Sequence, residues 1–173
     1  MKPANEFVLL NKHHDRKDFN CGRAELNRFI KEFAAKNAEL NISKTFVLPS
    51  VNGAQICSFY TLSPSELKRQ TIPDKSFAKK YPGYPLPVFL IAQLAVELRC
   101  QKIGLGGITL IDALNNCLKM SKLMPAMAVV VDALDESAYQ FYERYGFHEL
   151  EIKDATRPRL YISMNDVKAL LEP

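Results

Sequence analysis

The stretch Leu94–Gly107, which reads LAVELRCQKIGLGG, joins an apolar run to a cluster of glycines. The run, Val88–Val96, is apolar on both alternations except at Gln93, which is typical of a strand buried on both faces. The residues after the glycines have the spacing of one helix face. Consecutive backbone N–H groups at a helix N-terminus can face an anion, and glycines let a phosphate approach the chain. The stretch therefore predicts a site for a phosphorylated ligand, with a purely structural turn as the alternative.

Two familiar phosphate-binding motifs do not fit this stretch. No G-K-[ST] follows the glycines, which excludes a nucleotide-hydrolysing P-loop. A dinucleotide-binding G-x-G-x-x-G that began at Gly104 would need glycine at position 109, which is Thr109.

The rest of the chain alternates helical and strand-like patterns. Apolar spacing predicts a helix over about 23–39, with Gly22 as its N-cap. A first short strand precedes this helix and a hairpin follows it. The hairpin consists of Lys44–Leu48 and Ala54–Leu62. The other predicted elements are a long connection over 63–87 that can include one short helix, a strand at Met127–Val131, a helix at Glu136–Tyr145, and final strands at Phe147–Leu150 and Leu160–Met164. No repeat or domain boundary appears, so residues 1–173 are predicted to form a single domain.

Composition excludes several classes of protein. With 173 residues, of which 47% are hydrophobic, the chain can bury a full core without disulfides or metal. Its four cysteines are far apart and lack a C-x-x-C, so neither a zinc site nor a disulfide framework is indicated. The longest apolar run is about half of what a membrane-spanning helix needs. We therefore expect a soluble, cytoplasmic protein with reduced thiols, no metal site and no membrane association.

The connection over 63–87 is rich in basic residues. Its cations are Lys68, Arg69, Lys75, Lys79 and Lys80. Charge runs usually face water, so a solvated loop is the ordinary interpretation. The alternative is a basic rim beside a site. The net charge of +4 permits a polyanionic partner without requiring one.

Two motifs resemble those of the GNAT acetyltransferases. Gln101-x-x-Gly104-x-Gly106 after Leu94-Ala95-Val96 resembles their acetyl-CoA pyrophosphate loop, and Phe141–Phe147 (FYERYGF) resembles their F-Y-x-x-x-G-F signature. The resemblance implies an α/β (α+β) GNAT fold, with a central mixed, mostly antiparallel sheet of six to seven strands flanked by about four helices.

A narrower resemblance covers nearly the whole chain. Several segments resemble the acetyltransferase toxins of type II toxin–antitoxin pairs: His14–Gly22 with Glu25–Asn27, Lys44–Val47, Phe59–Leu62, Leu94–Glu97 and Val129–Ala133. Lys102 and Ile103 depart from the family, where many members have glycine and a polar residue. The basic connection is also matched less closely.

The resemblance implies a site for acetyl-CoA. The backbone around Leu94, Ala95 and Val96 would pair with the pantetheine amides. The pyrophosphate would be held by the glycine loop, which comprises Gln101, Lys102, Ile103, Gly104, Leu105, Gly106 and Gly107. Tyr142 matches the general acid of the family, although its position on the apolar face of the predicted helix Glu136–Tyr145 would by itself indicate a core tyrosine.

A general base is harder to assign. Glu97 follows the strand and could serve, but an acidic residue at a strand end is more often solvated. An α-amine has a reference pKa near 7.7–8, against about 10.4 for lysine, and esterification of the carboxyl lowers it further. An aminoacyl-tRNA amine therefore needs little or no base.

Three hypotheses follow for the function. In the first, the chain is a toxin that acetylates the α-amine of aminoacyl-tRNA and blocks translation. Its tRNA contacts would come from Lys68, Arg69, Lys79, Lys80 and Arg99, and its partner would be a ribbon-helix-helix antitoxin; a homodimer is left open. In the second, a GNAT enzyme of the same fold acetylates a small-molecule or protein amine. In the third, the chain is a non-catalytic module that binds CoA or a partner.

Overall fold

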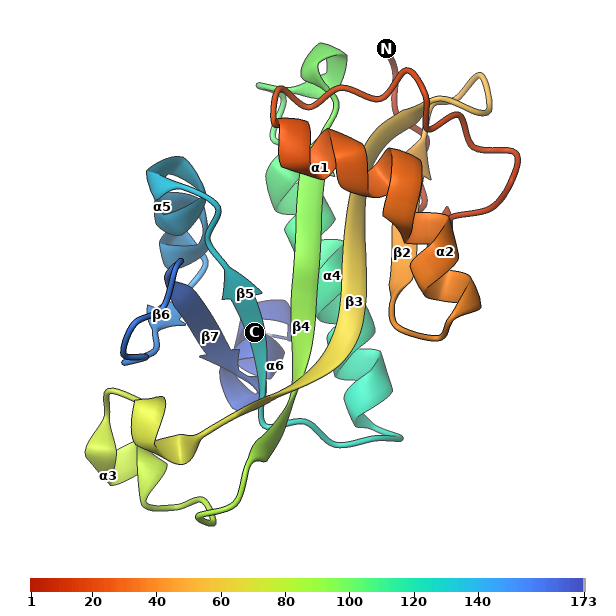
Figure 1. Ribbon diagram of the computed structural model, residues 1–173. Coiled ribbons are helices and arrows are strands. Elements are labelled where there is room, and N and C mark those ends of the chain that lie inside the picture. The colour runs from red at the N-terminus through yellow and green to blue at the C-terminus, as the bar shows by residue number, and fades with distance from the viewer. Residues whose placement is uncertain (173) are drawn as a thin grey trace. The chain divides into compact units, whose positions relative to one another are not determined.

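The computed structural model describes residues 1–172, which group into two compact units. The first unit comprises Met1–Ser63 and Ala92–Ala113, and the second comprises Pro64–Ile91 and the chain from Leu114 onward. Seven strands form a mixed sheet in the order β1-β2-β3-β4-β5-β7-β6 (Figure 1). This sheet and its helices confirm the predicted fold class. The assignment of residues 1–173 to a single domain stays a prediction.

The first unit contains an antiparallel ladder covered by a helical stretch. Its elements are β1 (Val8–Leu9), α1 (Ala24–Arg28), a π-helical turn (Phe29–Phe33), α2 (Ala34–Glu39), β2 (Lys44–Pro49), the start of β3 (Ile56–Leu67), the end of β4 (Leu86–Val96), a 3-10 turn (Leu98–Cys100) and the start of α4 (Leu105–Ser121). Strand β2 pairs antiparallel with β1 and with β3. The predicted hairpin is therefore confirmed.

Large apolar side chains seal the helical stretch against these strands. Ile30 and Ala34 are fully buried and pack with Val47, Phe59 and Ala95. Helical structure runs from Ala24 to Glu39 as predicted. The predicted cap is wrong by one residue, because Arg23 is the N-cap and the preceding Gly22 has a φ of +82° that favours glycine.

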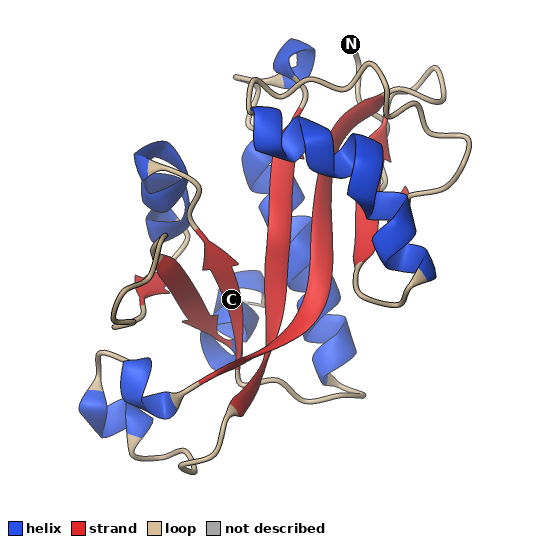
Figure 2. Ribbon diagram, in the orientation of Figure 1, coloured by secondary structure: helices blue, strands red, loops and turns tan. Residues whose placement is uncertain are grey.

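The second unit is built on a parallel strand pair extended by an antiparallel one (Figure 2). Its further elements are a 3-10 turn (Arg69–Thr71), α3 (Lys75–Ala78), β5 (Ala128–Asp132), α5 (Glu136–Arg144), β6 (His148–Glu149), β7 (Arg159–Ser163) and α6 (Met164–Leu171). Val88–Ile91 of β4 pairs in parallel with β5, which in turn pairs antiparallel with β7. Val88, Val130 and Tyr161 contribute to the buried core of this unit.

Two predictions along the chain need correction. The connection over 63–87 is shorter than predicted, since β3 continues to Leu67 and β4 begins at Leu86, while α3 is the one short helix that the prediction allowed. The predicted last strand ends at Ser163 rather than Met164. Ser163 caps α6, its hydroxyl accepting from the Asp166 N–H at 3.1 Å, and this helix was not predicted. Among the described helices, none is both long and apolar enough to span a bilayer.

Candidate active site

The glycine loop follows β4, as the sequence predicted, and its last three residues form the start of α4. Two of its residues have left-handed backbone conformations, Lys102 with a φ of 66° and Gly104 with a φ of 79°. Glycine adopts this region freely, whereas other residues held in sparsely populated backbone regions carry a cost on the order of 1–3 kcal/mol. The family's preference for glycine where this chain has Lys102 therefore has a physical reason. Lys102 adopts this unfavourable backbone conformation and adds a positive charge to the loop.

The start of α4 provides the donors that an anion requires. The Ile108 N–H bonds the Gly104 carbonyl at 3.3 Å, so the N–H groups that precede it in the first turn have no acceptor within the helix. The helix dipole adds partial positive charge at this end. Gln101 to Gly104 are exposed, while Leu105 is buried against Leu48, Cys57 and Cys100. The loop thus presents its backbone to solvent from a buried anchor, which suits a phosphate ligand.

The Gln101 side chain is occupied within the protein. Its Nε2 donates to the Cys21 carbonyl at 3.1 Å and to the Val96 carbonyl at 2.9 Å. The amide therefore links the loop to the end of β4 and to the segment before α1. Sequence patterns could not reveal this link, because Cys21 and Gln101 are far apart in the chain.

Glu97 is buried, and the expectation of a solvated carboxylate is wrong. Only 3% of it is exposed. Its oxygens accept the Asn20 N–H at 2.8 Å and the Arg99 guanidinium Nε–H at 3.0 Å. The Arg99 backbone N–H also donates to it at 3.5 Å, so the carboxylate is committed to donors of Asn20 and Arg99 and is a poor candidate for a general base. The guanidinium bond raises the pKa of Arg99, whose charge is paired at the point where we expected a tRNA contact.

The end of β4 is joined to the loop by a 3-10 turn over Leu98–Cys100. Ala95 is 5% exposed and packs in the core with Phe19 and Phe59, while Leu94 and Val96 are half-buried. The backbone of Leu94–Val96, rather than its side chains, is what a pantetheine arm could use.

Tyr142 lies in α5 of the second unit and is 7% exposed. Its ring lies 5.5 Å from that of Phe147, centroid to centroid. Burial, followed by the nearby charge of Asp132, raises the pKa of the phenol above its ordinary value near 10. Such a phenol stays protonated at physiological pH and can act only as a proton donor. Burial of this kind is compatible with both of the roles considered from the sequence.

Local capping fixes the position of α5. The Asp135 carboxylate accepts the Ala138 N–H at 2.9 Å at its start, and Gly146, with a φ of +87°, ends it as predicted. Arg159 holds Asp132 through two bonds of 2.7 and 2.8 Å. The charge next to Tyr142 is therefore itself fixed in place.

The basic connection divides into structural and free cations. Arg69 donates to the Tyr81 carbonyl at 2.6 Å, and Lys75 pairs with Glu151 at 2.6 Å. Lys80 lies over the ring of Phe77 within the same loop. Lys68 and Lys79 are exposed, and within the described residues their ammonium groups have no partner. Lys68 and Lys79 therefore face solvent, whereas Arg69 and Lys75 shape the loop.

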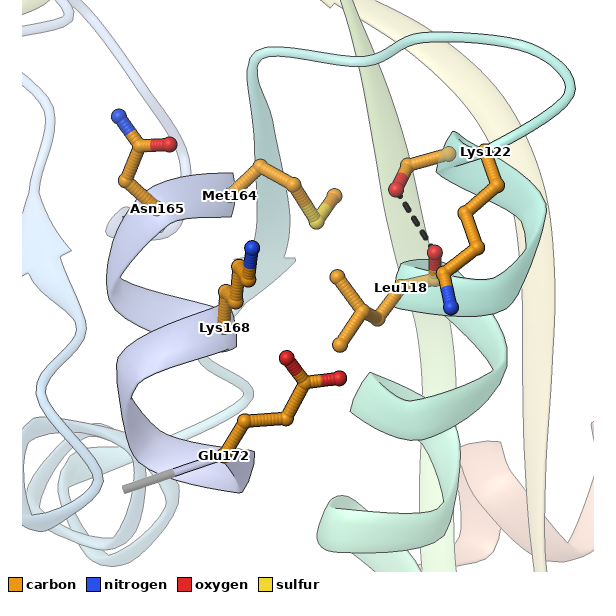
Figure 3. A pocket seen from close by; sticks show the side chains of 7 residues that line it. Leu118, Lys122, Met164, Asn165, Lys168 and Glu172 are labelled. Atoms are coloured by element: carbon orange, nitrogen blue, oxygen red, sulfur yellow. Dashed lines mark hydrogen bonds between the residues drawn. The ribbon is translucent and has the colours of Figure 1, made fainter.

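A pocket of about 290 Å³ lies in the second unit between the end of α4 and α6 (Figure 3). Its lining includes Leu118, Lys122, Met164, Lys168 and Glu172, and none of the predicted site residues. No sequence pattern indicated this pocket, because α6 was not recognised as a helix.

Among the described residues, no group of three histidine, cysteine or acidic side chains could hold a metal ion. All four cysteines are free and buried. Burial raises the pKa of both Cys57 and Cys117 to about 12, with a hydrogen bond to Cys100 adding to the effect at Cys57. These two thiols are protonated at physiological pH, so neither is a nucleophile.

Comparison with known proteins finds toxins among those that are similar to this chain. No family model matches the chain. A tRNA-acetylating toxin of Mycobacterium tuberculosis is 28% identical over 153 residues, which cover 88% of each chain. A probable toxin TacT of Sinorhizobium fredii is 24% identical over 166 residues, covering 91% of this chain and 90% of the relative.

Solved structures extend the comparison to the fold. AtaT complexed with acetyl-methionyl-tRNAfMet superposes with a TM-score of 0.87 at 25% identity, over 95% of this chain and 98% of AtaT. AtaTR bound with AcCoA gives 0.82 at 25% identity, over 95% and 96%. A Tyr-to-Phe mutant of AtaT bound to the C-terminus of the antitoxin AtaR and acetyl-CoA gives 0.81 at 20% identity, over 97% and 98%. The resemblance found in the sequence is thereby confirmed: the chain is similar over most of its length to tRNA-acetylating toxins and shares the fold of the solved AtaT structures.

Proposed function

We propose that this protein transfers the acetyl group of acetyl-CoA to the α-amine of aminoacyl-tRNA, and that it is the toxin of a toxin–antitoxin pair. The observation that carries the proposal is the match over 95% of the chain to AtaT in complex with acetyl-methionyl-tRNAfMet. The tRNA-acetylating toxin of M. tuberculosis supports the same activity from sequence.

Acetyl-CoA would bind along the end of β4 and the glycine loop. The backbone of Leu94, Ala95 and Val96 would hold the pantetheine arm, and the backbone of Gln101–Gly107 would hold the pyrophosphate. The free N–H groups of the first turn of α4 and the charge of Lys102 fit this anion. Bound there, acetyl-CoA supplies an already activated thioester.

The protein itself supplies a proton for the departing thiolate and orients the bound thioester. The neutral amine attacks the thioester carbonyl, the C–S bond breaks, and the thiolate takes the phenolic proton of Tyr142. The attacking nitrogen then loses a proton, which restores the phenol of Tyr142 either directly or through solvent. A thiol has a reference pKa of about 8.5, which is lower than the pKa of the Tyr142 phenol. The phenol is therefore the weaker acid, and its proton moves to the sulfur only as negative charge develops there. With Glu97 committed to Asn20 and Arg99, the low pKa of the substrate amine takes the place of a general base.

A direct assay tests the activity. Incubation with labelled acetyl-CoA and total aminoacyl-tRNA, followed by nuclease digestion, is expected to yield acetylated aminoacyl-adenosine and to identify the amino acid. Label that appears only in small amines or in protein would instead support the second hypothesis. The absence of label from every fraction, with acetyl-CoA still bound, would support the non-catalytic module.

The exposed lysines of the second unit would bind tRNA phosphates. Replacing Lys68, Lys79 and Lys80 with alanine is expected to weaken tRNA binding and to flatten its log–log salt dependence by about 0.7–0.9 for each phosphate that is no longer neutralised. Arg69 is kept in this variant because it holds the Tyr81 carbonyl. Filter binding across a salt series provides the measurement.

A triple alanine variant at Lys12, Lys31 and Lys36 removes the same charge from exposed positions of the first unit and should leave the slope unchanged. If the slope changes only in this second variant, the tRNA surface does not involve the basic connection.

The proposed function also implies partners and a location. An antitoxin would neutralise the protein, as AtaR is the antitoxin bound by AtaT, and we propose a ribbon-helix-helix protein for this role. Because aminoacyl-tRNA is the substrate, the protein would act in the cytoplasm.

A further inference from the structure

We propose that the segment Asn20–Gly22, which precedes α1, is a positioning element for the glycine loop and acts on it through Gln101 and Glu97. This inference rests on the proposed function, since it concerns how the acetyl-CoA site is held in shape. It assigns the side chains of Gln101 and Glu97 to positioning rather than to contact with the cofactor.

The first connection is the amide of Gln101. One nitrogen donates to two carbonyl oxygens, that of Cys21 at 3.1 Å and that of Val96 at 2.9 Å. The residue that opens the loop is therefore tied to the strand before it and to a segment far away in the sequence. Both bonds use side-chain donors, which leaves the backbone N–H groups of the loop available to a ligand.

The second connection is reciprocal and runs through Asn20. Its N–H donates to the buried Glu97 carboxylate at 2.8 Å, and its carbonyl accepts the Leu98 N–H at 2.8 Å. Glu97 and Leu98 lie between β4 and the glycine loop. The turn that leads into the loop is therefore held from two sides by a single residue of the N-terminal segment.

The segment is itself rigid, which a positioning element requires. The Asn20 Oδ1 accepts from the Gly22 N–H and from the Asn27 amide, both at 2.9 Å, and the Asn27 Oδ1 accepts the Cys21 N–H at 2.8 Å. Asn27 belongs to α1, whose stretch is packed on the core of the first unit. The helix therefore fixes Cys21 through Asn27, and the Cys21 carbonyl in turn holds the Gln101 side chain.

These bonds matter because the first part of the loop has little else to fix it. Residues 101–104 are exposed, and the next buried anchor is Leu105. The loop also contains the left-handed Lys102, a conformation that persists only where the surroundings hold it. Without the Gln101 amide, Lys102 can relax and the N–H groups aimed at pyrophosphate lose their alignment.

The test compares two acetyl donors. Gln101→Met removes the amide donor, keeps the length of the side chain and adds no charge. We expect KM for acetyl-CoA to rise about 10- to 100-fold, because two hydrogen bonds are removed. Turnover of acetyl-pantetheine, which has no pyrophosphate, should fall much less than turnover of acetyl-CoA. A protein that had merely been destabilised would lose activity with both donors.

A second variant acts from outside the site. Asn27→Ala should raise KM for acetyl-CoA in the same direction, although Asn27 touches only Asn20 and Cys21 in this network. Asn27→Asp keeps the acceptor for the Cys21 N–H and should restore part of the effect. Gln55→Met, at an exposed glutamine, is the matched control for Gln101→Met.

Wild-type KM values for acetyl-CoA in both Gln101→Met and Asn27→Ala would overturn the inference, as would equal losses with the two donors. Failure of the proposed function has a different signature, namely a wild-type protein that acetylates no amine. In that case calorimetric binding of CoA to the same variants still decides the inference, because weaker binding supports it and unchanged binding refutes it.

Discussion

Tyr142→Phe is expected to lower acetyl transfer by about 10²–10⁴-fold, the range for the loss of a general acid. The substitution removes one hydroxyl and keeps the ring that packs against Phe147. Folding should therefore survive. Because burial and Asp132 raise the pKa of the phenol, the wild-type proton donor is present throughout the physiological range, and the defect should persist at every pH tested there. Growth arrest on expression should disappear as well.

Initial rates with aminoacyl-tRNA and calorimetry with acetyl-CoA separate the two roles of this tyrosine. Tyr145→Phe is the matched control, since Tyr145 lies on the same apolar face of the predicted helix, and its ring centroid is 5.2 Å from that of Phe141. It should retain activity. Wild-type turnover in Tyr142→Phe, with unchanged affinity for acetyl-CoA, would show that Tyr142 is a core residue only.

Gly106→Asp is expected to abolish measurable acetyl-CoA binding. Gly106 lies in the first turn of α4, where the pyrophosphate would sit, and the new carboxylate would bring a negative charge against an anion. An aspartate in the first turn of a helix is favourable to the helix itself, so the protein should remain folded. Calorimetry with acetyl-CoA provides the measurement, and circular dichroism checks the fold.

Two controls distinguish charge from size. Gly106→Ala adds a methyl group without charge and should bind acetyl-CoA much better than Gly106→Asp. Gly83→Asp introduces the same charge at an exposed glycine, where the nearest atoms to an added Cβ belong to the Arg69 side chain at 3.9 Å, and should bind normally. An unchanged dissociation constant in a folded Gly106→Asp protein would refute the assignment of the loop.

Local patterns were sufficient for most of the fold. Strand β4, helix α4 and helix α5 each carry a periodicity or a terminating glycine that is visible in a short window, and all three lie where the sequence predicted. The missed elements lack such a signal. Helix α6 follows its strand without a break, so the apolar residues of Leu160–Met164 continue one pattern across a change of structure.

What the sequence determined by itself is the backbone of the candidate site: a buried strand, a glycine loop that starts a helix, and a tyrosine on the helix that ends at Gly146. These depend on residues close together in the chain, whose spacing and conformational preferences can be read directly. Only the tertiary structure decided the environment of the side chains. Glu97 is buried rather than solvated, and Gln101 is bonded to Cys21, because folding brings Asn20 and Cys21 to the end of β4. Such contacts join residues far apart in sequence, and no local periodicity encodes them.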